Sequence, residues 1–163
     1  MYREILTKAI IAKGEKTIID EYNIKTEHTI SKVLGCWIIN HIHNVYLQNQ
    51  KVFIKGSYEA NFWYGYDDNT KCSLLTKTYE FNDEIPFNYT LEKSNLSEKN
   101  ELLDYEITPP SCFKMTFEND ELIIKVERKY AIDIIGETKI KIKVDDVIID
   151  QMINTDYVNE RKQ

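Results

Sequence analysis

Hydrophobic and polar side chains alternate along residues 51–66 with a period of two. In KVFIKGSYEANFWYGY the even positions are mostly apolar or aromatic and the odd positions mostly polar. Successive side chains of a β-strand point to opposite sides of a sheet, so this pattern predicts a strand with one buried and one solvated face. Two large aromatics, Phe53 and Trp63, fall on the solvated face. The predicted buried face consists of Val52, Ile54, Tyr58, Ala60, Phe62, Tyr64 and Tyr66.

Residues 67–70 (DDNT) end this alternation with residue types that favour turns, because Asp and Asn tolerate a left-handed backbone. CSLLTKTYEF at 72–81 alternates again, so the two segments are predicted to form a hairpin. Paired carboxylates beside aromatics also occur in glycosidase sites. Asp67 and Asp68 are adjacent, however, and adjacent strand residues point to opposite faces. Their interpretation as turn residues is therefore favoured.

A second pair of alternating segments flanks Gly136. ELIIKVERKYAIDII at 121–135 and TKIKIKV at 138–144 each place apolar residues on one face. With a glycine between them, they are predicted to form another hairpin. The polar face of the later segment carries Lys139, Lys141 and Lys143.

Antiparallel strands of this kind predict an all-β fold. Further strands are predicted at 2–13, 33–42 and 112–119. A break is expected at Pro109-Pro110, because proline lacks the N–H that a ladder needs. Two sheets that bury their apolar faces against each other give an antiparallel β-sandwich of about eight or nine strands. We expect this sandwich at 1–145 and a short helical or irregular tail at 146–163.

Composition and charge narrow the function. The chain has 163 residues, enough for one domain with its own core. A formal charge of −6 argues against a general nucleic-acid binder, which needs a basic surface. The opening residues lack the apolar block of a secretory signal, and no stretch approaches the ~20 apolar residues of a membrane span. We therefore expect synthesis in the cytosol, without membrane insertion.

The acidic residues are concentrated in one segment. Residues 80–106 carry eight acids and two lysines, which accounts for the whole formal charge. The segment is interpreted first as a solvated loop and strand edge. A more specific hypothesis is that it docks on the lysine face of 139–143 in an adjacent copy, in which case salt would weaken assembly.

Catalytic motifs are not found in the sequence, and the chain is predicted not to be an enzyme. His41 and His43 share one face of a predicted strand, and His28 could join them. Three histidines can bind zinc, but a site also needs geometry that a sequence does not supply. Exposed or hydrogen-bonded strand histidines are the favoured interpretation, so no metal and no cofactor is assigned.

The three cysteines, Cys36, Cys72 and Cys112, have neither zinc nor disulfide-framework spacing. They are interpreted as buried, reduced thiols. Cys72, beside the predicted turn, is the candidate for cross-linking if the protein is later oxidised.

Four blocks of residues, in this order, carry a resemblance to a known family. They are YREILTKAIIAKG at 2–14, HTISKVLGCWIINH at 28–41, GSYEANFWYGYDDNTK at 56–71 and GETKIKIKV at 136–144, with Pro110-Ser111-Cys112 also matching. Over residues 2–144 the chain resembles the CotE family of outer spore coat morphogenetic proteins from endospore-forming Firmicutes. Its short, weakly acidic end is similar to that of a clostridial-type relative, where many members have a long acidic tail.

The resemblance implies a non-catalytic scaffold of the spore coat, made in the mother-cell cytoplasm. Such a protein self-associates into a homo-oligomer or filament over the basement-layer coat morphogenetic ATPase. It then recruits other outer coat or exosporium proteins to the forespore surface. The matched positions that carry over are Leu34, Gly35, Cys36, Trp37, Asn40 and His41, and Trp63, Tyr64, Asp68, Asn69, Thr70 and Lys71. Whether they serve the fold or a contact stays open.

Two functional hypotheses follow, with a metal-dependent enzyme using the histidines as a third. In the first, a self-assembling scaffold makes its contacts through Trp63, Phe53, Asp68, Asn69, Lys71, Lys139, Lys141 and Lys143. An outward tryptophan on a strand is typical of an interface anchor. In the second, a carbohydrate- or peptidoglycan-binding sandwich module stacks Trp63, Tyr64 and Tyr66 on sugar rings.

Overall fold

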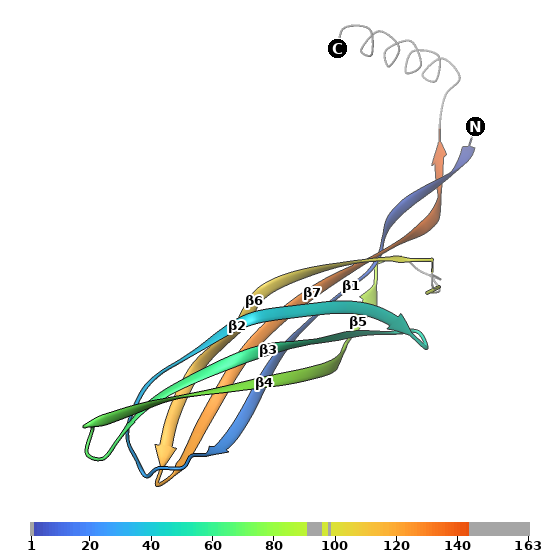
Figure 1. Ribbon diagram of the computed structural model, residues 1–163. Coiled ribbons are helices and arrows are strands. Elements are labelled where there is room, and N and C mark those ends of the chain that lie inside the picture. Colours follow the sequence, from blue (N-terminus) through green and yellow to red (C-terminus); the bar gives the residue numbers. More distant parts are fainter. Residues whose placement is uncertain (1, 91–95, 98, 144–163) are drawn as a thin grey trace, which may run out of the picture. The chain divides into compact units, whose positions relative to one another are not determined.

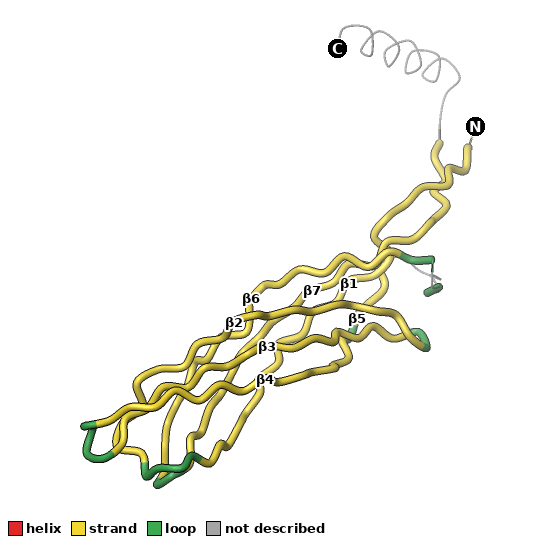
Figure 2. Tube along the Cα trace, viewed as in Figure 1, coloured by secondary structure: helices red, strands yellow, loops and turns green. Residues whose placement is uncertain are grey.

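The computed structural model describes residues 2–90, 96–97 and 99–143, in which the secondary structure consists of seven β-strands (Figure 1). The strands are β1 (Tyr2–Lys25), β2 (Ile30–Gln48), β3 (Lys51–Tyr66), β4 (Lys71–Ile85), β5 (Phe87–Tyr89), β6 (Glu101–Glu118) and β7 (Glu121–Lys143). No helix occurs in these residues, and short turns join long strands (Figure 2). The predicted tail at 146–163 lies outside the described residues.

The chain divides into two compact units. One contains Ile10–Ile135, and the described part of the other consists of residues 2–9 and 136–143. Strands β1 and β7 are long enough to contribute to both. In the smaller unit, the ammonium of Lys141 lies 5.6 Å from the centre of the Tyr2 ring. The sites described below lie in the larger unit.

The larger unit is a sandwich of two sheets. Sheet order is β5-β1-β7-β6 in one layer and β2-β3-β4 in the other (Figure 1). Their inner faces share one core, in which Val52 and Ile54 of β3 pack in the same cluster as Tyr130 and Ile132 of β7. The predicted all-β antiparallel sandwich is confirmed.

Strand β3 is the central strand of its sheet, and its predicted buried face is confirmed except at Tyr66, which is half-buried. The exposed fraction is 0% for Val52, Ile54, Tyr58, Ala60 and Phe62 and 3% for Tyr64. The predicted turn follows, with positive φ at Asp67, Asp68 and Asn69. The amide and hydroxyl of Thr70 both donate to the Asp67 carbonyl, at 3.0 and 2.6 Å. Residues 51–85 therefore form the expected hairpin.

The prediction of a hairpin at Gly136 is wrong, because β7 runs through it as one strand. No glycine of the described chain has positive φ, and a tight turn at Gly136 would need it. The predicted break at Pro109-Pro110 is also wrong, since β6 continues across it with irregular register between Thr108 and Ser111. Strand β6 is an edge strand, where a missing N–H leaves no neighbour unpaired. The strands are therefore fewer and longer than the sequence pattern predicts.

A buried ion network joins the two sheets between β1 and β4. Arg128 of β7, 1% exposed, pairs with Asp20 of β1 at 2.9 Å and with Asp83 of β4 at 2.7 Å. Its guanidinium lies 3.9 Å from the centre of the Phe81 ring. Burial acts to lower the pKa of Arg128, but the hydrogen bonds to the two carboxylates outweigh burial and raise it above its ordinary value. Arg128 therefore stays charged, and it holds three strands together.

Candidate functional site

The outward face of the β2-β3-β4 sheet carries exposed large apolar side chains. Trp37 of β2 is 42% exposed and Trp63 of β3 is 41% exposed. Their ring centres lie 6.3 Å apart with an angle of 82° between the planes. Leu74 of β4, 55% exposed, lies opposite Trp63 in the ladder and so on the same side of the sheet. Trp37, Asn61, Trp63 and Leu74 are called the outer aromatic face.

Asn61 provides the buried polar centre of this face. It lies opposite Trp37 on β2 and opposite Thr76 on β4, and it is 6% exposed. Its Oδ1 accepts a hydrogen bond from the Thr76 hydroxyl at 2.8 Å. Its Nδ2 has no hydrogen-bond partner in the described structure. A buried donor without an acceptor is unfavourable, so Asn61 is held beneath the exposed rings at a cost in stability.

The other predicted interface residues do not form one surface with Trp63. Phe53 is half-buried on the same side of β3, stacked on Tyr46 with ring centres 5.4 Å apart. It lies ten residues from Trp63, which along a strand is about 33 Å. Asp68, Asn69 and Lys71 are exposed in and beside the hairpin turn. Lys139, Lys141 and Lys143 are exposed in the smaller unit.

The residue set predicted to stack on sugars is wrong as a single platform. Tyr64 is 3% exposed and points inward, whereas its neighbour Trp63 points outward. Tyr66 stacks against His28, with ring centres 3.7 Å apart. The strand pleat thus divides Trp63 from the two tyrosines, and the edge-on geometry of Trp37 and Trp63 does not offer one flat aromatic surface.

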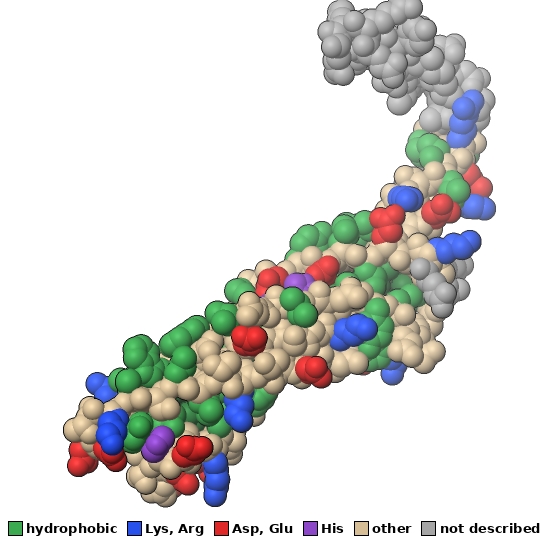
Figure 3. Space-filling view, viewed as in Figure 1, with side chains coloured by type: hydrophobic (Ala, Val, Ile, Leu, Met, Phe, Trp, Pro, Cys, Tyr) green, Lys and Arg blue, Asp and Glu red, His purple; other side chains and the backbone are tan. Residues whose placement is uncertain are grey.

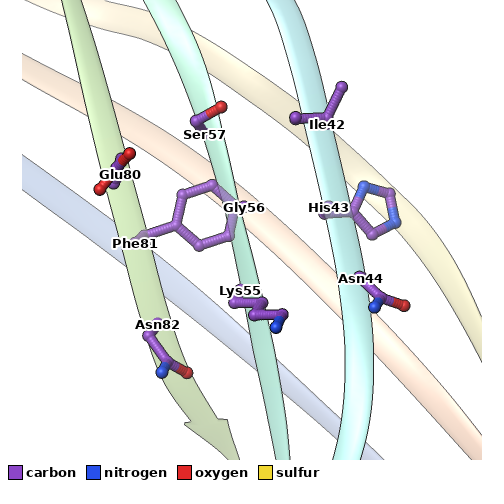
Figure 4. Close-up of a pocket in the computed structure, with 9 residues that line it drawn as sticks. All are labelled: Ile42, His43, Asn44, Lys55, Gly56, Ser57, Glu80, Phe81 and Asn82. Carbon is purple, nitrogen blue, oxygen red and sulfur yellow. The ribbon is translucent and has the colours of Figure 1, made fainter.

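A shallow hollow of about 610 Å³ lies beside Gly56, lined by three residues from each of β2, β3 and β4 (Figure 4). Gly56 is required there, because a Cβ would overlap the carbonyl oxygen of Ile42 on β2. Ser57 pairs in register with Ile42, not with His43. The His43 ring points away from the other lining residues, toward the side of β2 next to β6 (Figure 4). The hollow therefore does not bring Ser57 and His43 together as a nucleophile and its base.

Histidines and acids meet where β2 approaches β6. His41 Nδ1 lies 2.6 Å from a Glu106 carboxylate oxygen, and His43 Nε2 lies 2.5 Å from Asp104. In Figure 3, histidine atoms lie between acidic side chains on this edge. Burial lowers the pKa of His41 below its ordinary value, and the opposing effect of Glu106 does not reverse this. These four residues are called the His–acid cluster. His28, grouped with them from sequence, instead bonds to the Tyr64 hydroxyl at 3.2 Å.

Two of the three cysteines lie on this same β2–β6 side. The thiols of Cys36 on β2 and Cys112 on β6 hydrogen-bond to each other, which raises the pKa of Cys36 and lowers that of Cys112. Both are half-buried, whereas Cys72 is exposed at the start of β4. The structure therefore brings together a thiol pair that sequence spacing did not suggest.

The amino-acid sequence matches one known protein family. The family model described as outer spore coat protein E (CotE) matches residues 1–163, the whole chain. The chain belongs to the CotE family. The resemblance seen in the sequence is thereby confirmed, and the protein is an outer spore coat protein. No curated protein and no solved structure matches the chain. Among the described residues of this CotE-family protein, no helix is long and apolar enough to cross a membrane.

Several residues of these sites escaped sequence reasoning. Trp37 lies in a matched block, but β2 shifts register against β3 at three places, so simple alternation does not give its face. Asp104 and Glu106 were counted only as part of an acidic segment. Arg128 lies on the same side of the alternating segment 121–135 as Ile124 and Tyr130, and that position is a sequence signal for the interior.

Proposed function

We propose that this CotE-family protein is a non-catalytic scaffold of the spore coat. It self-assembles and recruits other outer coat or exosporium proteins to the forespore surface, over the basement-layer coat ATPase. The observation that supports this is the outer aromatic face, on which two tryptophans and a leucine are exposed around a buried, unpartnered amide donor. Large exposed apolar patches on folded domains mark contact surfaces.

Covering this face contributes favourable free energy to an assembly contact. Covering the exposed part of each indole, about 100 Å², contributes about 2.5 kcal/mol at the usual value per unit area. Tryptophans dominate binding energy where they are fully desolvated. A second copy of the chain is the partner we assign to this face.

The edge of β4 is a less favourable contact. Its ladder with β3 is regular from end to end, and its other side is unpaired within the described sheet. Lys77, however, is exposed and lies opposite Ala60, whose side chain is on the inner face. A charged residue on the inner side of an edge strand discourages addition of another strand. The face of this sheet, and not its edge, is therefore the proposed contact.

The lysine hypothesis makes a different prediction about salt. Within the described chain, Asp83 pairs with Arg128 and Glu84 with Lys51 of the same molecule, and the carboxylates of Asp104 and Glu106 are already occupied by contacts with histidines. Fewer acids of the 80–106 segment are thus available for Lys139, Lys141 and Lys143 of an adjacent copy. Assembly through the aromatic face would persist as salt rises, whereas assembly through the lysines would weaken.

Light scattering and electron microscopy of the full chain at micromolar concentration test the scaffold. The wild type is expected to form oligomers or filaments, and the Trp37→Ala/Trp63→Ala double variant to form much smaller species. Phe113→Ala is the matched control, since Phe113 is a 51% exposed aromatic on the other sheet. Circular dichroism verifies that each variant is folded. A monodisperse wild-type monomer would overturn the scaffold, and an unaffected double variant would overturn the assigned face.

A further inference from the structure

The two histidines of the His–acid cluster are held on one side of β2 by a bulge. Asn40 has a φ of 53°, and the register with β3 shifts between Ile39 and Ile42. Ile42, between the histidines, is 66% exposed, while the side chains of His41 and His43 are only 12% and 18% exposed. The rings lie 5.0 Å apart, 22° from parallel. Both imidazoles are thereby directed toward β6.

Carboxylates complete the cluster from the other sheet. One ligand atom from each of His41, His43 and Glu106 can be chosen so that all lie within 4.8 Å of one another. Tetrahedral zinc ligands about 2.1 Å from the metal lie about 3.4 Å apart, so side-chain movements of roughly 1.4 Å or less would close the site. Asp104, on His43, is placed to be a fourth ligand or to bind a metal-bound water.

The charge of the cluster favours a cation. Glu106 and Asp104 each hold a carboxylate oxygen against an imidazole nitrogen, at 2.6 Å from His41 and 2.5 Å from His43. Arg128, the cation whose charge reaches His41, is already paired with Asp20 and Asp83. Glu106 and Asp104 are therefore not neutralised by it.

The hydroxyl group of Tyr130 fixes the orientation of the His41 ring. The Tyr130 hydroxyl lies 3.0 Å from His41 Nε2, while His41 Nδ1 faces Glu106. With Nδ1 on a metal, the Nε2–H would donate to the Tyr130 oxygen. Such second contacts fix the tautomer and the ring orientation of metal-binding histidines.

We propose that His41, His43 and Glu106 bind one Zn²⁺ ion, which joins β2 of one sheet to β6 of the other. Two imidazoles with a carboxylate are a donor set for zinc and not for calcium or magnesium, which prefer all-oxygen sites. The ion would replace the direct contact between His41 and Glu106, and its binding would release any proton held there to solvent. The site is independent of the outer aromatic face, which lies on the opposite side of the sheet.

Zinc titration of the metal-free full chain, followed by calorimetry and elemental analysis, tests the proposal. We expect one zinc per chain and a rise in the thermal midpoint when zinc is added. His43→Gln and Glu106→Gln are each expected to lower the affinity at least tenfold. His28→Gln is the matched control, because His28 stacks on Tyr66 and is not in the cluster, and it should bind zinc like the wild type.

Two further measurements distinguish loss of the zinc site from loss of folding. Cobalt(II), as a substitute, is expected to give the intense visible absorption of a tetrahedral site in the wild type and not in His43→Gln. Each variant is also compared with itself with and without zinc, so a folded but destabilised variant remains informative. If the wild type binds less than one zinc per chain, or if His43→Gln and Glu106→Gln bind as tightly as the wild type, the proposal is wrong.

Discussion

Different side-chain interactions join the two sheets along the two long sides of the sandwich. On the β1–β4 side, the buried Arg128 pairs with Asp20 and Asp83, and Tyr22 stacks on Tyr79 with ring centres 3.7 Å apart. On the β2–β6 side, half-buried histidines meet carboxylates and two thiols meet each other. The first side depends on a charge that persists at any ordinary pH. The second depends on groups that respond to protons, metal ions and oxidants.

Only the β2–β6 side can change its protonation or redox state while the protein stays folded. A guanidinium that is fully buried between two acids cannot change state without unfolding its surroundings. Imidazole is the side chain whose ordinary pKa lies near neutral pH, and thiols change with redox conditions. We therefore expect the β1–β4 side to set the overall stability and the β2–β6 side to respond to the environment.

The largest effect is expected from Arg128→Met. Removing the guanidinium leaves Asp20 and Asp83 without their cation inside the sandwich, which typically costs about 3–5 kcal/mol. Urea denaturation measures the change. Lys129→Met is the control, since Lys129 meets the exposed Glu15 at 4.0 Å and such pairs are worth less than about 1 kcal/mol. Equal effects from the two variants would show that the buried network does not hold the β1–β4 side.

Gly56→Ala tests how closely β2 approaches β3 beside the His–acid cluster. The new Cβ would overlap the Ile42 carbonyl oxygen, and relief requires a backbone shift that costs about 1–3 kcal/mol. Gly35→Ala on β2 is the matched control, because its Cβ would meet Trp37 at an ordinary 4.0 Å. The urea midpoint is expected to fall for Gly56→Ala and to stay nearly constant for Gly35→Ala. The reverse order would contradict the close approach at Gly56.

Acid is expected to destabilise the β2–β6 side through His41. The folded pKa of His41 is lowered, so below its ordinary value of about 6.5 the unfolded chain takes up a proton that the folded chain does not. Stability from this group is therefore complete above that pH and is lost as pH falls toward the folded pKa. His41 is faced by Glu106, His43 and Arg128. In urea midpoints measured across this window, His41→Gln is expected to flatten the slope; an unchanged slope would exclude His41 as its source.

The smallest effect on stability is expected from Cys72→Ser, although it changes reactivity. Cys72 is exposed, whereas Cys36 and Cys112 are half-buried free thiols that hydrogen-bond to each other. Iodoacetamide labelling read by mass spectrometry should modify Cys72 first. Treatment of assemblies with oxidised glutathione should then give reducible dimers in the wild type that are lost in Cys72→Ser. Dimers that survive this substitution would assign the cross-link to another thiol.

Much of the fold can be predicted from the sequence, because the alternation of apolar and polar residues follows directly from the pleat of a β-strand. The faces of β3 and the turn at 67–70 follow from this rule and from the backbone preferences of Asp and Asn. The rule fails where the ladder is irregular. Three register shifts in β2 change the side to which Trp37 and His41 point, and local periodicity contains no trace of them.

The sites were harder to predict because they form between segments distant in the chain. His41 meets Glu106, and Cys36 meets Cys112, only after the two sheets are stacked. The turn predicted at Gly136 and the break predicted at Pro109-Pro110 are wrong for a related reason. Their usual effect on a strand is local, but here a neighbouring strand or an edge position decides the outcome.

The pairing of β1 with β7 constrains the order in which the molecule can be made. During synthesis the β2-β3-β4 meander has all its hydrogen-bonding partners once residue 85 has left the ribosome. Strand β1 can pair early only with the three-residue β5, and it lacks its long partner β7 until the last strand emerges. Contacts between the two ends of a chain form slowly, since a long loop must close first. Until then the tyrosine-rich inner layer of the meander is uncovered, so nascent chains would need shielding by a chaperone or rapid completion.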